Sequence, residues 1–328
     1  MRAIELSRYG GPEDLRCIEL PRPEPGPGEV RVEVAGASIN DWDWGLVRGR
    51  PLYIRALCGW RAPRVRVPGV DASGRVAAVG EGVTDWVPGD AVMGDLSDPM
   101  RFGAFAEHVV APAGVWVRAP RSVPLRDAAG LPHAAALAYQ SLVEVAGLRA
   151  GQRVLVNGAG GGVGTIAVGL ARHLGAREVV AVDAAEKLPR LLELGYDAAL
   201  DYRSTDFTRE AGLFDVVLDV KTTRPPGHYA RALAPGGTYV TVGGDTGRLL
   251  QLATLGRLRS GGGRRLRVLA LKPGRGVAEV AELLDTGEVQ LEIDGVHPLE
   301  EASAALRRFG EARHTGKVLL DVAGASGA

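Results

Sequence analysis

Apolar residues in the middle of the chain change their spacing between Val154 and Asp183. Val154, Leu155 and Val156 form a short apolar run, as in a strand that is buried on both faces. A glycine-rich stretch follows, and apolar residues then return at the spacing of one helix face: Val163, Ile166, Ala167, Leu170 and Leu174. A second apolar run, residues 179–182, ends in Asp183. The pattern predicts a strand, a tight turn, a helix and a second strand.

The turn in this unit consists largely of glycine: Gly158, Gly160, Gly161, Gly162 and Gly164, with Val163 between the last two. A residue without a Cβ lets the main chain turn sharply, lets a diphosphate approach the backbone and lets the helix pack against the strand. The helix N-terminus adds free N–H groups and a partial positive charge. Asp183 can accept hydrogen bonds from a ribose and would repel a 2′-phosphate. The unit therefore predicts a dinucleotide site that favours NAD(H) over NADP(H).

Further apolar runs continue this alternation of strands and helices. We expect strands over residues 198–202, 214–220, 237–242 and 268–271, with helical segments over 186–194 and 228–233. Strands that alternate with helices predict an α/β fold with a doubly wound parallel sheet. Gly243 and Gly244 end one of these strands at the edge where such sheets bind ligands.

The N-terminal third has a different pattern, with short apolar runs separated by proline and glycine. Strands of a β-rich, partly barrel-like domain are predicted over residues 30–35, 74–79, 90–93 and 106–110. A helical stretch over 125–146 leads to the dinucleotide unit, and a helix over 299–309 and a strand over 317–322 return to the first domain. We therefore assign residues 1–118, completed by 272–328, to the β-rich domain and residues 119–271 to the dinucleotide-binding domain.

Length and charge narrow the class of protein. At 328 residues the chain is long for one core and fits two domains. Lys plus Arg equal Asp plus Glu at 39 each, so no net charge favours nucleic acid or a membrane surface. The N-terminus lacks the apolar segment of a secretory signal, and no apolar run reaches the length of a membrane span. We expect a cytoplasmic protein in which Cys17 and Cys58 stay unpaired.

Motifs outside the glycine turn extend over nearly the whole chain. In order, they are PRPEPGPGEVRVEVAGASIN, PGVDASGRVAAVGEGV, PGDAVMG, GAFAEHVVAP, LGYDAALDY and GKVLLDV. The sequence resembles the medium-chain dehydrogenase/reductase superfamily, and within it the zinc-free quinone oxidoreductase-like branch. The resemblance implies a GroES-like catalytic domain from both chain ends, a Rossmann domain between them and a homodimer. It also implies hydride transfer from NAD(P)H to a small-molecule substrate, either a quinone or the C=C of an α,β-unsaturated carbonyl, as in a biosynthetic enoyl reductase.

The resemblance also assigns site residues. The family's residue at Asn40 lies beside the nicotinamide, and its amide can donate to a substrate oxygen on which negative charge develops. Tyr53 is a second candidate, as a donor or as the proton source for the α-carbon. Further cofactor contacts are implied by position: Lys187 and Arg203, which could reach a 2′-phosphate, Tyr202 against the adenine, Val242 with Gly243 and Gly244 at the nicotinamide end, and Lys317.

Zinc alcohol dehydrogenases of the same superfamily are the alternative class. Their structural site uses four clustered cysteines, and this chain has two cysteines in all. At two of their three catalytic ligand positions the resemblance places Asn40 and Val70, so we expect no metal site. His133 follows Pro132 at a predicted helix start, which could place it at the cleft, but we favour its interpretation as a partly exposed residue. Leu137 and Lys221 depart from the branch pattern and leave a third class open, a cofactor-binding protein with little catalysis.

Overall fold

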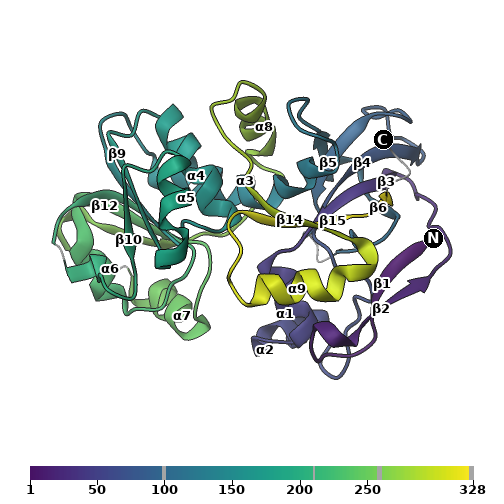
Figure 1. The fold of residues 1–328 in the computed structure, drawn as a ribbon, viewed down its shortest axis with the longest axis horizontal. Helices are drawn as coiled ribbons and strands as arrows, with labels where there is room; N and C mark the ends of the chain where they lie inside the picture. Colours follow the sequence, from purple (N-terminus) through teal and green to yellow (C-terminus); the bar gives the residue numbers. More distant parts are fainter. Residues whose placement is uncertain (98–100, 210, 257–260, 325–328) are drawn as a thin grey trace. The chain divides into compact units, whose positions relative to one another are not determined.

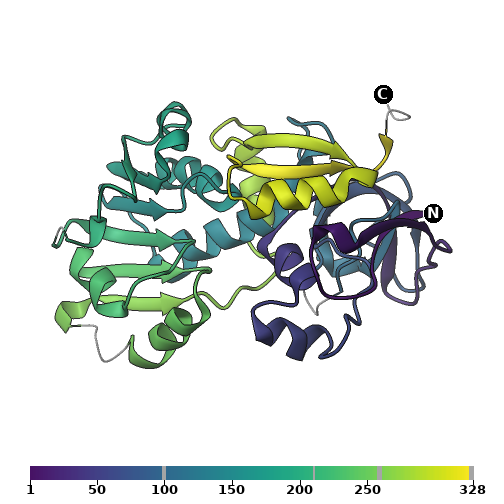
Figure 2. The same cartoon turned by 60° about the horizontal axis from the view of Figure 1, so that its bottom comes forward.

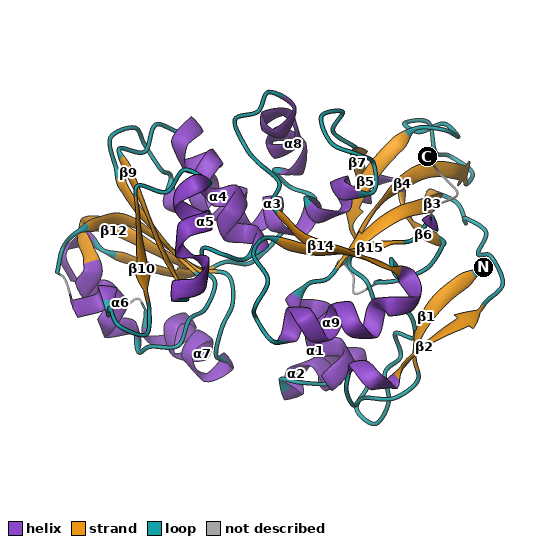
Figure 3. Cartoon of the chain, viewed as in Figure 1, coloured by secondary structure: helices purple, strands orange, loops and turns teal. Residues whose placement is uncertain are grey.

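The computed structural model describes residues 1–97, 101–209, 211–256 and 261–324, and the chain divides into two compact units. Unit 1 contains residues 1–133, 273–285 and 293–328, and unit 2 contains residues 134–272 and 286–292. Figure 1 follows the chain through both units, and Figure 3 colours their helices and strands. Residues 119–133 thus belong to unit 1, and residues 286–292 belong to unit 2.

Unit 2 is built on a six-stranded sheet in which every neighbouring pair is parallel. Its strands are β8 (Arg153–Asn157), β9 (Glu178–Asp183), β10 (Ala198–Asp201), β11 (Phe214–Asp219), β12 (Leu233–Thr241) and β13 (Arg265–Val268). They lie in the order β10-β9-β8-β11-β12-β13. This is the doubly wound order, in which the order of the strands along the sheet reverses between β8 and β11, and it confirms the predicted fold class.

Four helices accompany this sheet: α4 (Gly162–His173), α5 (Leu188–Glu193), α6 (Pro226–Ala232) and α7 (Thr246–Leu255). Figure 3 shows α4 and α5 on one side of the strands and α6 on the other. Val154, Leu155 and Val156 are fully buried, as expected for a strand covered on both faces. Ile166 and Leu170 of α4 are also buried, so the predicted apolar face of this helix is its packing face.

Unit 1 contains a seven-stranded sheet made mostly of antiparallel pairs. The strands of unit 1 are β1 (Arg2–Leu6), β2 (Leu15–Glu19), β3 (Glu29–Ser38), β4 (Asp71–Val79), β5 (Ala91–Asp95), β6 (His108–Pro112), β7 (Trp116–Arg118), β14 (Ile293–Pro298) and β15 (Lys317–Asp321). β1 pairs with β2, while the larger sheet runs β14-β15-β3-β4-β5-β7 with β6 also paired to β3. Because β15 pairs with the end of β3, the last strand of the chain lies beside the first domain's central strand.

Helices of unit 1 include α1 (Asp41–Arg48), α2 (Leu52–Cys58), α8 (Val277–Asp285) and α9 (Ala302–Gly310). Figure 2 shows β14 and β15, in yellow, alongside α9. α3 (Pro132–Tyr139) starts at the end of the first long segment of unit 1 and is followed by a π-helical segment, Gln140–Ala146. None of the helices in the described ranges combines the length and apolar character needed to cross a bilayer.

Some elements of the structure differ in position from the prediction, and others were not predicted. The helix expected over 125–146 is three successive helical segments, the first a short 3-10 turn over Asp127–Gly130. The sixth strand of unit 2 covers residues 265–268, three residues before the predicted 268–271. It is an edge strand with mostly exposed side chains, so it carries no continuous apolar run. β14 and α8 were not predicted at all.

Candidate functional site

The glycine turn of unit 2 joins the end of β8 to the start of α4. Gly158 has a φ of +81°, a conformation that favours glycine, and Gly161 is the N-cap of α4. At Gly164 an added Cβ would lie 2.3 Å from the carbonyl oxygen of Ala159, so the helix can pack here only without a side chain. At Gly161 the nearest atom would be 3.6 Å away. The surface over Gly161 is therefore open to a ligand.

Two predicted cofactor residues converge on Gly160. The Asp183 carboxylate accepts a 2.7 Å hydrogen bond from the Gly160 N–H through Oδ2. Its Oδ1 lies 3.8 Å from the Lys187 ammonium, and both side chains are about nine-tenths buried. An added Cβ at Gly160 would lie 2.6 Å from the Lys187 side chain. The Asp183 carboxylate thus hydrogen-bonds the glycine turn and pairs with Lys187, the lysine that could otherwise bind a 2′-phosphate.

Tyr202 and Arg203 follow β10, beside β9. The Tyr202 side chain is half exposed, and the Arg203 guanidinium lies 5.4 Å from the centre of its ring. Arg203 also forms an ion pair with Glu186 at 2.9 Å. The structure therefore gives Arg203 an acidic partner, which weakens its interpretation as a phosphate ligand.

A buried polar network lies where β8 and β11 end, and the sequence analysis missed it. Asp219 accepts hydrogen bonds from Asn157 at 2.7 Å and from the Tyr239 hydroxyl at 2.6 Å. The Thr222 hydroxyl bonds Asp219, Tyr239 and Thr241. Burial raises the pKa of Asp219, although these donors work in the opposite direction. Thr222, which follows β11, therefore connects the ends of β11 and β12.

The same network holds the predicted nicotinamide-end segment. The Thr222 N–H donates to the Gly243 carbonyl oxygen at 3.2 Å. Gly244 has a φ of +124°, and a Cβ there would lie 2.4 Å from the Thr222 nitrogen. Glycine is required at this close approach of two backbones. Val242 itself bonds back to Asp219 through its N–H at 3.0 Å.

In unit 1 a second buried cluster brings Asn40 and Lys317 together. Lys317 begins β15 and Asn40 follows the end of β3, and these two strands pair. The Lys317 Nζ donates to the Asn40 Oδ1 at 2.7 Å and to the Asp71 Oδ2 at 3.3 Å. The Asn40 Nδ2 in turn donates to Asp71 at 3.0 Å, and so does the Ser38 hydroxyl at 2.8 Å. The side-chain oxygen and nitrogen of Asn40 are both engaged inside the protein.

His133 completes this cluster, and its interpretation as a partly exposed residue was wrong. Its backbone N–H donates to the Asp71 Oδ1 at 3.0 Å, and its ring Nδ1 lies 2.8 Å from the Asp95 Oδ2. The residue is only 8% exposed. Burial, the largest single influence, lowers the pKa of His133, but the charge of Asp95, the hydrogen bond to Asp95 and the charge of Asp71 together raise it above its ordinary value. For Asp71, burial dominates and raises the pKa of the carboxyl although Lys317 lowers it.

Asp43 fixes the start of α1 beside this cluster. Its two carboxyl oxygens accept hydrogen bonds from the backbone N–H groups of Asn40, at 2.9 Å, and Gly69, at 2.8 Å. The side chain is fully buried, and burial raises its pKa to about 7. Asp43 therefore orients the loop that carries Asn40.

Tyr53 is placed differently from Asn40. It lies on α2 with 45% of its surface exposed. Within the described ranges its hydroxyl has no hydrogen-bond partner. Burial, with a smaller effect from Asp41, raises the pKa of the phenol, so the hydroxyl keeps its proton at neutral pH. Of the two predicted donors, Tyr53 is the one whose O–H is available to a ligand.

A metal site requires several thiol, imidazole or carboxylate side chains that lie close together. Cys17 is exposed on β2, and Cys58 is buried in α2. Across the described residues, His, Cys, Asp and Glu side chains form no group of three or more that could hold a metal ion. Asp71 and Asp95 are instead bonded to the donors of the cluster.

Comparison with known proteins places both units in one class. Residues 26–121 match the alcohol dehydrogenase GroES-like domain, and residues 194–320 match a family described as zinc-binding dehydrogenase. The chain is 30% identical over 332 residues to the chloroplastic quinone-oxidoreductase homolog of Spinacia oleracea, which covers 98% of each protein. A solved structure of the CurK enoyl reductase superposes with a TM-score of 0.84 and 26% identity, covering 98% of this chain and 99% of that one.

The chain therefore belongs to the medium-chain dehydrogenase/reductase superfamily, among its quinone oxidoreductase-like members, and is an oxidoreductase. The resemblance seen in the sequence is confirmed. A third relative is the polyketide synthase GfsB of Streptomyces halstedii, 35% identical over 272 residues that make up 77% of this chain. That match spans only 4% of GfsB, so the chain corresponds to a small segment of the much longer synthase.

Proposed function

We propose that the protein is a zinc-independent NAD(P)H-dependent reductase that adds hydride to a quinone or to the C=C of an α,β-unsaturated carbonyl. The observation that carries this proposal is the glycine turn at the point where the strand order of a doubly wound sheet reverses. Relatives named as a quinone oxidoreductase homolog and an enoyl reductase support the two substrate classes.

The residues of unit 2 fit a nicotinamide dinucleotide. The open surface over Gly161 and the start of α4 would hold the diphosphate, with Gly160, Gly162 and Val163 lining the turn. Asp183 would bind the adenosine ribose, and its position beside Lys187 supports a preference for NAD(H) over NADP(H). When bound, the reduced cofactor supplies a hydride. The segment 242–244, held by Thr222, would carry its nicotinamide end.

Unit 1 supplies the hydrogen-bond donor and the proton source that the reaction needs. Hydride addition to the β-carbon of an enone moves negative charge to the carbonyl oxygen, which then needs a hydrogen-bond donor. The Tyr53 hydroxyl is protonated and available, so it donates to this oxygen or protonates the α-carbon. Asn40 acts as a positioning residue that holds Lys317 through its Oδ1.

Zinc independence rests on the chemistry of the donors. A zinc Lewis acid needs three or four converging thiolate, imidazole or carboxylate ligands. The acidic groups nearest Asn40 are bonded to Lys317 and His133, a set in which each anion already has a cationic or N–H partner. An alcohol dehydrogenase of the zinc type would need this cluster to be rebuilt.

Homodimerisation and a cytoplasmic location are part of the same proposal. β13 is an edge strand of the sheet of unit 2, and Val268 at its end is 37% exposed. Such an edge can pair with a second copy of the chain. Light scattering of the purified protein would test the dimer.

The proposed function is tested by following the loss of NADH absorbance with a panel of quinones and enones, after metal analysis of the protein. We expect turnover by protein that contains no stoichiometric zinc. Turnover that requires zinc would favour the alcohol dehydrogenase class. Tight NADH binding with no turnover of any acceptor would favour a cofactor-binding protein.

A further inference from the structure

The lysine that departs from the branch pattern, Lys221, lies beside the glycine turn of unit 2. It follows the end of β11, which pairs with β8 so that Asp219 lies opposite Asn157. The Val220 N–H then donates to the Asn157 carbonyl oxygen at 2.9 Å, which continues the pairing to the end of β8. Gly158 follows Asn157 along the chain, so residues 220 and 221 border the first glycine of the turn.

The stem of the Lys221 side chain packs over this glycine. A Cβ added to Gly158 would lie 3.3 Å from the Lys221 Cγ and 3.1 Å from the Cβ of Val220. Lys221 is exposed, whereas Thr222 after it is fully buried. The aliphatic carbons of Lys221 therefore cover the start of the turn, and the ammonium group at the end of the side chain stays in contact with solvent.

The Lys221 ammonium has no acidic partner among the residues that the structure describes. The nearest carboxylate along the chain, that of Asp219, is buried and accepts a 2.9 Å hydrogen bond from the Lys221 backbone N–H. Its two oxygens also accept hydrogen bonds from Asn157, Thr222 and Tyr239. Within the described chain, a full positive charge therefore remains unpaired at the edge of the turn.

Two other cations beyond the carboxyl ends of these strands are already paired with carboxylates. Lys187 lies 3.8 Å from Asp183, and Arg203 forms an ion pair with Glu186. α4 begins without a side-chain cap, so its first N–H groups can meet an anion, but they carry only a partial charge. The diphosphate of a dinucleotide carries a full negative charge on each phosphate. Of these three cations, Lys221 is the one that can balance such a charge.

We propose that Lys221 is a cofactor-binding residue whose ammonium pairs with the diphosphate of the nicotinamide dinucleotide. The inference rests on the proposed function and adds to it a residue that the family resemblance does not assign. It gives the departure at Lys221 a role in binding rather than a part in a loss of catalysis. Because lysine acts on a phosphate as an exposed point charge, its contribution weakens as salt screens it.

Calorimetry with ADP-ribose, which contains the diphosphate but no nicotinamide, tests this assignment. Lys221→Met keeps the stem and removes the charge, so we expect about tenfold weaker binding at low ionic strength. Lys221→Arg should restore most of the affinity. Added salt should narrow the difference between the unmodified protein and Lys221→Met. Adenosine, which lacks the phosphates, should bind equally to both proteins.

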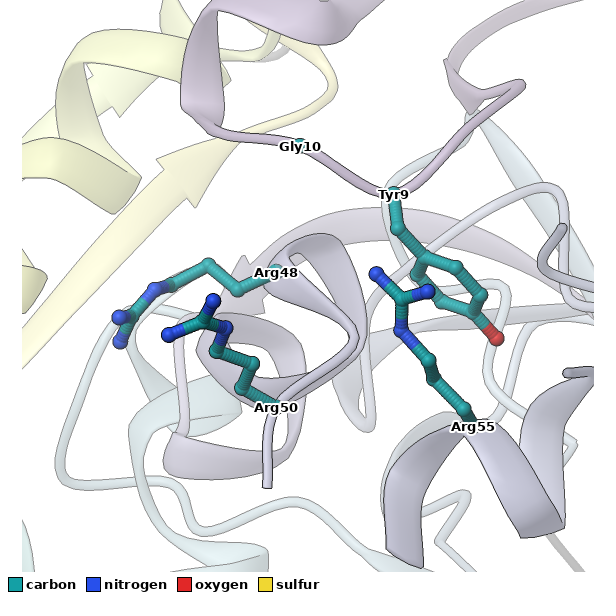
Figure 4. Close-up of a pocket in the computed structure, with 5 residues that line it drawn as sticks. All are labelled: Tyr9, Gly10, Arg48, Arg50 and Arg55. Atoms are coloured by element: carbon teal, nitrogen blue, oxygen red, sulfur yellow. The ribbon is translucent and has the colours of Figure 1, made fainter. Parts of the chain in front are cut away.

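Two controls separate this contact from a general effect of positive charge. Arg177→Met removes an exposed cation just before β9, at the amino edge of the same sheet. Arg48→Gln/Arg50→Gln removes two of the three arginines that, with Arg55, line a hollow of about 300 Å³ in unit 1 and could themselves attract a phosphate (Figure 4). Both variants should bind ADP-ribose within about twofold of the unmodified protein.

Unchanged binding of ADP-ribose by Lys221→Met would overturn the inference, as would an equal loss in either control or an equal loss of adenosine affinity. NADH and NADPH carry the same diphosphate, so Lys221→Met should weaken the binding of both by the same factor. A loss confined to NADPH would assign the ammonium to the 2′-phosphate and would also overturn the inference. If the unmodified protein binds neither ADP-ribose nor NADH, the proposed function itself is contradicted.

Discussion

Replacing Lys317 with methionine removes the ammonium group that lies 3.3 Å from the Asp71 carboxylate. Asp71 is fully buried and Lys317 is 4% exposed, so water cannot take over the lost interaction. Removing one partner of such a buried pair costs about 3–5 kcal/mol of unfolding free energy. Hydrogen bonds to Asp71 from Ser38, Asn40 and the His133 N–H remain, so we expect about 3 kcal/mol at pH 8.

The pH dependence of this loss provides a sharper test than its size. Burial already raises the pKa of Asp71, and Lys317 is the group that most lowers it, so its removal raises that pKa further. A carboxyl with a raised pKa in the folded state binds a proton more tightly when folded than when unfolded. Its protonation therefore stabilises the fold at low pH, and this stabilisation is lost as pH rises through the folded pKa. The difference between variant and unmodified protein should shrink from pH 8 to pH 5.5.

Urea unfolding monitored by tryptophan fluorescence measures this difference in unit 1 alone, because the five tryptophans lie between residues 42 and 116. Arg61→Met, at an exposed arginine of unit 1, is the control and should change stability by less than about 0.5 kcal/mol. A loss below about 1 kcal/mol at pH 8, or a loss that stays constant down to pH 5.5, would refute the charge pair as described.

Three other predictions concern the proposed site. Gly164→Ala places a Cβ 2.3 Å from a carbonyl oxygen and should weaken NADH binding at least about tenfold in calorimetry, whereas Gly114→Ala, in unit 1 with no atom within 4 Å of the added Cβ, should bind NADH as the unmodified protein does. Asp183→Ser removes the acceptor and frees Lys187, so the kcat/KM ratio should shift towards NADPH; an unchanged ratio would show that Asp183 does not face the ribose. Tyr53→Phe should lower kcat about a hundredfold with little change in NADH affinity, and an unchanged kcat would remove Tyr53 from the mechanism.

The doubly wound unit could be predicted because its central strands are continuous apolar runs and its turn is rich in glycine. β13 was misplaced because an edge strand with arginines on its exposed face carries no such run. β14 was missed for a similar reason, since its side chains are only partly buried or exposed. Periodicity detects elements that bury a face, and these strands are held mainly by backbone pairing.

Candidate site residues were predictable where a local pattern marks them and not where distant residues meet. Asp183 could be singled out because it follows an apolar strand, and Asn40 because the family resemblance marks its position. His133 could not be assigned correctly because its partner Asp95 ends a strand 38 residues earlier. One signal was present, since Asp71 and Asp95 each adjoin an apolar run, and buried carboxylates require partners.

The central claim is that this chain transfers hydride from NADH to an activated C=C without a metal. Mass spectrometry of the product formed from an enone and the 4,4-dideuterated cofactor tests it most directly, with protein that has been treated with a chelator and shown to be free of zinc. We predict one deuterium at the β-carbon of the product. Unlabelled product, or labelled product only after zinc is restored, would contradict the account.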